Sequence, residues 1–120
     1  MKDKNCLFCK IASKEEPAEV VWEDDEFMCI ENKYPVAPVH VLVIPKSHEA
    51  KKEWIEGQNM GVTLPEFWGK MMMSVFTVVH QLELDKTGYK LVNNGAGYNH
   101  FEHEHMHILG GTKFEPGGTT

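Results

Sequence analysis

Arginine is missing from this sequence: all 12 basic residues are lysines, against 18 acidic residues, for a net charge of −6. The deficit of positive charge argues against a general nucleic-acid binder, because phosphate backbones are held by basic surfaces. The lack of arginine also excludes the planar, bidentate clamp that proteins commonly use for phosphate. Any phosphate bound by this chain must therefore rely on backbone N–H groups, lysine, hydroxyls or histidine.

Long apolar runs are missing as well. No stretch approaches the roughly 20 consecutive apolar residues that a membrane-spanning helix needs. Residues 1–16 are rich in charge and lack the apolar stretch of a signal peptide. Three cysteines without an export signal do not suggest a disulfide framework. We therefore expect a cytoplasmic protein in a reducing setting, with no membrane or nucleic-acid partner.

The 120 residues suit one domain over 1–120, since single domains most often run to roughly 100–150 residues. Apolar side chains recur at three- and four-residue steps from Pro65 to about Leu84, which predicts one long helix. The glycine-rich tail over 110–120 is expected to be flexible except near Phe114. Short β-branched and aromatic runs predict strands over 19–25, 27–30, 40–44, 89–92 and 102–109. An antiparallel five-stranded sheet with one long helix packed on it makes this an α+β domain.

Histidine is concentrated in one place: four of the seven lie within residues 100–107. His103, His105 and His107 alternate, and alternate side chains of a strand point to the same face. We therefore expect three imidazoles on one face and the intervening apolar side chains in the core. Such a row can share a metal. Alternatively, one histidine can act as a nucleophile while its neighbours orient it and donate hydrogen bonds to an anionic oxygen.

The His-x-His-x-His motif, with two apolar residues and a Gly-Gly pair after it, resembles the signature of the histidine triad (HIT) superfamily. The resemblance covers nearly the whole chain and is closest to the Hint-like branch. It implies a HIT-like fold that dimerises through the long helix and an adjoining strand into a ten-stranded sheet. The upstream blocks that carry it, in the family's order and spacing, are residues 6–11, 17–18, 23–25 and 37–48.

The resemblance implies a hydrolase that cleaves a purine nucleoside 5′-phosphoramidate or a related adenylate through a nucleotidyl-histidine intermediate. The nucleophile would be His105, and His107 would hydrogen-bond the phosphate oxygens. His40, on the neighbouring strand, and His103 would complete the catalytic cluster. A backbone carbonyl around residues 94–95 would hold the second ring nitrogen of the nucleophile.

Cys6 and Cys9 form a Cys-x-x-Cys pair, which alone is compatible with redox chemistry or with two incidental thiols. The resemblance implies instead a structural zinc, bound by these two cysteines together with His48 and His103. Two thiolates and two imidazoles make a closed, tetrahedral ligand set of the kind that zinc prefers.

The resemblance also implies where the nucleotide binds. Asn32 stands where an acidic residue usually holds the ribose hydroxyls, and Asn93 matches an asparagine near the phosphate and ribose. Asn99 and His100 stand near the leaving group, where His100 could protonate a departing amine or alcohol. The base would lie between apolar side chains that suit a core equally well: Leu7, Phe8, Ile11, Ile30 and Leu42.

Two departures keep alternatives open. Glu104 stands where the motif normally has an apolar residue, so its carboxylate needs solvent or a partner. The run from Asn32 to Pro35 looks more like the diadenosine-polyphosphate hydrolases, which makes a dinucleoside-polyphosphate hydrolase the nearest rival. The other rival is a nucleotide- or zinc-binding regulatory module with little turnover.

Overall fold

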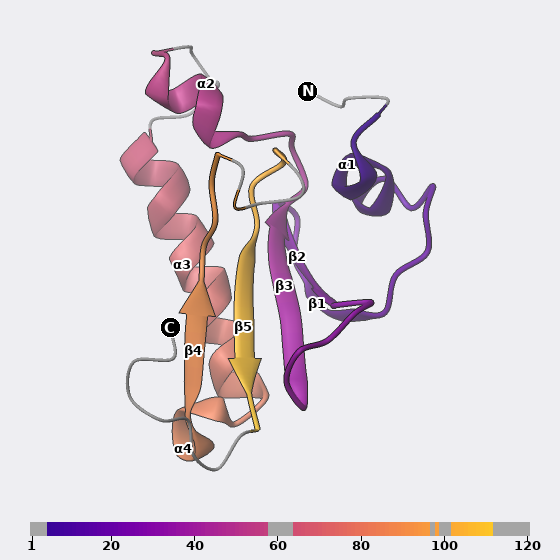
Figure 1. Ribbon diagram of the computed structural model, residues 1–120, viewed down its shortest axis with the longest axis vertical. Coiled ribbons are helices and arrows are strands. Elements are labelled where there is room, and N and C mark those ends of the chain that lie inside the picture. Colours follow the sequence, from indigo (N-terminus) through magenta and orange to yellow (C-terminus); the bar gives the residue numbers. More distant parts are fainter. Residues whose placement is uncertain (1–4, 58–63, 97, 99–101, 112–120) are drawn as a thin grey trace.

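The computed structural model describes residues 5–57, 64–96, 98 and 102–111 (Figure 1). No helix in these ranges is long and apolar enough to cross a membrane. The helices and strands, in chain order, are α1 (Leu7–Ala12), β1 (Val20–Glu23), β2 (Phe27–Glu31), β3 (Val39–Pro45), α2 (Lys51–Ile55), α3 (Leu64–Gln81), α4 (Leu84–Thr87), β4 (Tyr89–Val92) and β5 (Met106–Gly110).

The five strands form one antiparallel sheet in the order β1-β2-β3-β5-β4, which confirms the predicted α+β fold. β3 is the central strand. Leu42 on β3 pairs with Ile30 of β2 on one side and with His107 of β5 on the other. This register brings the last histidine of the motif next to the strand that carries His40.

The two faces of the sheet are covered by different helices, α3 on one face and α1 on the other (Figure 1). Strand residues alternate between the faces, as the pleat requires. The α3 side holds Val41, Val43, Met106 and Ile108 in one core cluster, so the apolar residues after His105 and His107 point into the core as predicted. The α1 side holds a second cluster, formed by Cys6, Phe8, Cys9, Ile11, Met28, Ile30, Leu42 and Ile44.

The long helix is shorter than predicted. α3 ends at Gln81 rather than near Leu84, because Glu83 adopts a left-handed conformation with φ of 59° that interrupts the helix. Leu84 then begins the separate helix α4 and packs into the α3-side core. The sequence did not predict α1 or α2; helices this short depend on tertiary contacts for their stability.

The last strand also begins later than predicted, at Met106 rather than at Glu102. The β3–β5 ladder ends with the pair Val43 and Met106. Two residues further along β3 is Pro45, which has no N–H to offer a ladder, while its carbonyl lies 2.7 Å from Nε2 of His103. Residues 103–105 therefore leave the sheet and carry two of the three motif histidines in an irregular segment. The predicted tail from 112 onward lies outside the described residues.

Candidate functional site

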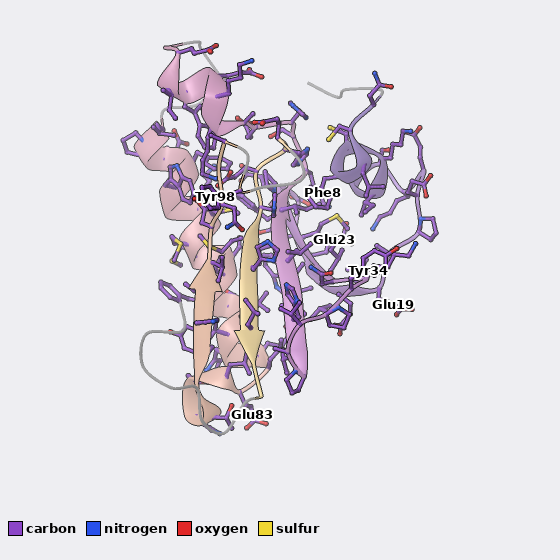
Figure 2. The ribbon with its side chains drawn as sticks, viewed as in Figure 1. Phe8, Glu19, Glu23, Tyr34, Glu83 and Tyr98 are labelled. Atoms are coloured by element: carbon purple, nitrogen blue, oxygen red, sulfur yellow. The ribbon has the colours of Figure 1, made fainter. Side chains whose placement is uncertain are left out.

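The candidate site lies on the α1 side of the sheet, where β3, the start of β5 and residues 103–105 meet. His103 and His105 are buried. Phe8, a residue of α1, lies where this helix meets the sheet (Figure 2). Its ring packs edge-on against both histidines, with centroid separations of 5.8 and 5.2 Å. The rings of His105 and His107 are 5.3 Å apart. The structure thus brings the three histidines together, although only His107 belongs to a strand.

The ring of His105 is oriented by its own backbone segment. Its Nδ1 donates to the carbonyl oxygen of His103 at 2.9 Å. Because a carbonyl can only accept, Nδ1 carries the proton, and Nε2 of the neutral ring keeps its lone pair. The prediction that a carbonyl of residues 94–95 accepts from His105 Nδ1 is wrong, because the carbonyl of His103 does so. The carbonyl of Asn94 instead accepts from Lys51 Nζ at 3.1 Å. An imidazole held in this way is suited to act as a nucleophile.

His40 and His107 form a second pair of coupled rings. The backbone N–H of Val36 donates to His40 Nδ1 at 3.1 Å, so the proton of a neutral His40 is on Nε2. That nitrogen lies 2.9 Å from Nδ1 of His107 and donates to it. His107 in turn is left with its proton on Nε2. With His40 in this tautomer, His107 Nε2 is an N–H donor, as binding to an anion requires, and the Asn32 amide nitrogen 3.2 Å from His40 Nε2 is a close contact between two donors.

Burial lowers the pKa of His40 below its usual 6.5. Below pH 6.5 the unfolded chain therefore binds protons more readily than the folded chain at this residue, so the free energy of unfolding falls as the pH drops. We expect His40→Gln to flatten the decline in stability between pH 7 and pH 5, measured by urea unfolding. If the free energy of unfolding depends on pH in His40→Gln as it does in the wild type, the lowered pKa of His40 is contradicted.

Four side chains converge beside the histidine segment. The ligand-type atoms of Cys6, Cys9, His48 and His103 all lie within 4.8 Å of one another. Cys6 Sγ is 3.2 Å and Cys9 Sγ is 3.4 Å from Nδ1 of His103, and Cys9 Sγ is 3.3 Å from Nδ1 of His48. Residues far apart in sequence, from the start of α1, the segment after β3 and the motif, therefore form a cluster that could hold a metal ion.

The protonation chemistry of this cluster fits a metal. His103 Nε2 donates to the carbonyl of Pro45, which leaves Nδ1 with its lone pair facing the two thiols. Burial lowers the pKa of His103 to about 4, so its ring is neutral near pH 7. Burial also raises the pKa of Cys6 to about 11. Without a cation the Cys6 thiol therefore keeps its proton, and a bound metal would release it.

The apolar residues predicted to hold a base are grouped on the same face of the sheet. Phe8, Ile11, Ile30 and Leu42 belong to the α1-side cluster, whereas Leu7 is 38% exposed. Asn32 lies at the edge of this group, with its side-chain nitrogen 3.2 Å from His40 Nε2 and its Oδ1 accepting from the backbone N–H of Tyr34. Asn99 and His100 lie outside the described residues.

The sequence did not single out Lys51, which forms an ion pair with the buried Glu104. Glu104 accordingly has the partner that its position in the motif requires. Asn93 donates from Nδ2 to Glu104 Oε2 at 2.8 Å and to the carbonyl of His105 at 3.0 Å. Lys51 and Glu104 are 53 residues apart, and nothing in the local sequence pattern around either residue indicates the contact.

Comparison with known proteins decides the family. The HIT domain family model matches residues 13–114. The chain belongs to the HIT domain family. Protein HitA of Neisseria gonorrhoeae is 38% identical to this HIT domain over 110 residues, covering 88% of this chain and 95% of that protein. A 14 kDa zinc-binding protein of Brassica juncea is 31% identical over 106 residues, which cover 88% of this chain and 91% of that protein.

Solved structures agree with the fold of this HIT domain. A histidine triad protein from Clostridium difficile superposes with a TM-score of 0.83 at 30% identity, covering 96% of this chain and 97% of that one. A HIT family hydrolase from Legionella pneumophila gives a TM-score of 0.79 at 36% identity, covering 94% of this chain and 98% of that one. The chain is therefore similar over nearly its whole length to a HIT family hydrolase.

Proposed function

We propose that this HIT domain hydrolyses a purine nucleoside 5′-phosphoramidate or a related adenylate through a nucleotide covalently bound to His105. The observation that carries the proposal is the hydrogen bond from His105 Nδ1 to the carbonyl of His103. It makes Nε2 the nitrogen with the lone pair, on a ring held between Phe8 and His107. The similarity to a HIT family hydrolase supports the same class of reaction.

In the proposed reaction His105 Nε2 attacks the α-phosphorus of the nucleotide. A P–Nε2 bond forms, the P–N bond to the leaving amine breaks, and the amine departs with a proton taken from solvent. Water then attacks the same phosphorus and loses a proton to solvent, the P–Nε2 bond breaks, and the nucleoside monophosphate leaves. Throughout, His107 Nε2–H donates to a phosphate oxygen, in the tautomer in which His107 Nδ1 accepts from His40. No arginine is needed for a single phosphate.

The nucleotide itself would extend from these histidines along the α1 side of the sheet. The base would contact the apolar cluster, with the half-exposed Leu7 at its rim. Asn32 would hydrogen-bond the ribose without contributing charge. Asn93 uses its amide nitrogen on Glu104 and His105, so only its Oδ1 would be offered to the ligand, which suits a ribose hydroxyl better than a phosphate oxygen.

The proposal also includes a structural zinc bound by Cys6, Cys9, His48 and His103. The neutral His103 Nδ1 and the two adjacent thiols support it, as does the similarity to a zinc-binding protein. Bound there, zinc would supply a closed four-ligand link between α1, the end of β3 and the histidine segment. The backbone of His103 would then be fixed at the point where its carbonyl orients His105.

A homodimer through α3 completes the proposal. The helix buries one stripe of side chains against the sheet and exposes other large apolar residues. Met73 is 70% and Phe76 is 50% exposed, which gives α3 a second apolar face for a partner copy.

A substrate panel separates the proposed activity from its rivals. We expect kcat/KM for adenosine 5′-phosphoramidate to exceed that for diadenosine tri- and tetraphosphate by at least about tenfold, because no arginine is present to bind further phosphates. The converse order would establish the dinucleoside-polyphosphate hydrolase. Tight nucleotide binding with no product from any adenylate would establish the low-turnover binding module.

A further inference from the structure

The buried charge beside the nucleophile has no role in the reaction just described. Glu104 is buried, with its side chain only 2% exposed, and forms its ion pair with Lys51, whose side chain is 24% exposed. A buried ion pair adds little net stability, because desolvating the two charges offsets most of their attraction. Apolar residues of similar size would serve folding equally well. The pair at this position therefore calls for a reason other than stability.

The contacts of Glu104 lead directly to the backbone of His105. Asn93 Nδ2 donates both to Glu104 Oε2, at 2.8 Å, and to the carbonyl oxygen of His105, at 3.0 Å. The side-chain nitrogen of Asn93 thus links the Glu104 carboxylate to the backbone carbonyl of His105. Glu104 N–H donates to the carbonyl of Glu49 at 2.7 Å, which ties the same segment to the chain just before α2.

Lys51 connects the same group to the turn after β4. Its Nζ donates to the carbonyl of Asn94 at 3.1 Å as well as to Glu104. A Cβ built on Gly95 would lie 3.3 Å from Cδ of Lys51, so the lysine stem also lies close against this turn. One lysine thus holds both the turn at 93–95 and the residue next to the nucleophile.

We propose that Glu104 is a positioning residue for His105: held by Lys51, it fixes Asn93 and through it the peptide from which the nucleophile projects. This inference rests on the proposed function of His105. Residues 103–105 lie outside the strand ladder, so hydrogen bonds to their backbone help to define where the imidazole of His105 stands. A misplacement of about 1 Å at a reacting group can lower a rate on the order of 10²-fold.

The test is a double-mutant cycle with Lys51→Met and Glu104→Leu. Lys51→Met alone leaves a buried carboxylate without its cation and should lower Tm. The double variant has neither charge, and we expect its Tm to return to within about 3 °C of the wild type. Its kcat for adenosine 5′-phosphoramidate should remain lower by roughly 10- to 100-fold, with KM changed less than about threefold. Lys52→Met, on the exposed side of α2, is the matched control and should match the wild type.

A purely structural pair would give a different result: kcat would recover together with Tm in the double variant, and the proposal would be overturned. A second readout does not depend on turnover. In ¹⁵N spectra of the imidazoles, the Nδ1–H signal of His105 should shift or broaden in the double variant and stay unchanged in Lys52→Met. If the wild type turns over no adenylate, the proposed function fails, and this spectrum alone decides whether Glu104 positions the ring; an unchanged signal would refute it.

Discussion

His105→Ala should lower the hydrolysis of adenosine 5′-phosphoramidate by at least about 10³-fold, because the variant has no nitrogen to attack the phosphorus. KM should change far less than kcat, since the base and ribose contacts lie on other residues. Initial rates and KM measured on purified protein test this expectation. The ring of His105 contacts Phe8, so Tm of the variant should be measured on the same samples.

The control for this variant is His80→Ala. His80 is exposed on α3, on the opposite side of the sheet from the candidate site, and its removal should leave both kcat and KM unchanged. Hydrolysis by His105→Ala at the wild-type rate would show that another group attacks the phosphorus or that water does so directly.

Loss of the metal should have the largest effect on stability. We expect chelation, or Cys9→Ser, to lower Tm by about 10–20 °C, because the folded chain alone assembles the four ligands and binding therefore contributes to the free energy of unfolding. Elemental analysis of protein grown with zinc should give one zinc per chain in the wild type and none in Cys9→Ser. Thermal unfolding with and without chelator completes the measurement.

Cys29 provides the matched cysteine control. It is fully buried like Cys9, but it belongs to the core cluster on the α3 side of the sheet. Cys29→Ser should cost stability through the buried hydroxyl while keeping the full zinc content. Wild-type protein that contains no zinc and melts at the same temperature with and without chelator would refute the metal site.

Much of the sheet could be predicted from local patterns. The runs over 27–30 and 40–44 contain enough β-branched and aromatic residues to predict β2 and β3, and proline marks the end of β3. The start of β5 could not be predicted in the same way. Alternating histidines look like strand residues, but the ladder stops near Pro45 and the ring of His103 turns to its carbonyl.

The candidate site could likewise be predicted only in part. The spacing of the motif is enough to group His103, His105 and His107 and to predict that Met106 faces the core. The hydrogen-bond acceptor for His105 Nδ1 was predicted in the wrong segment. The carbonyl that accepts belongs to His103, in an irregular segment, and no residue pattern in the sequence indicates such a contact.

The partner of Glu104 was also beyond prediction. Only folding brings α2 beside the motif, and α2 is a five-residue helix that the sequence does not predict. The need for a partner, by contrast, follows from the residue type alone, since a carboxylate is costly to bury without a cation or donors.

The proposed reaction requires that the nucleotide be bound covalently to His105 during turnover. The intact mass of the protein, after rapid alkaline quenching during turnover of adenosine 5′-phosphoramidate, shows whether this adduct forms. We expect the mass to increase by one adenylyl group, localised by peptide mapping to His105 and absent from His105→Ala. Product formation at the full rate with no adduct at any time, or an adduct on another residue, would contradict it.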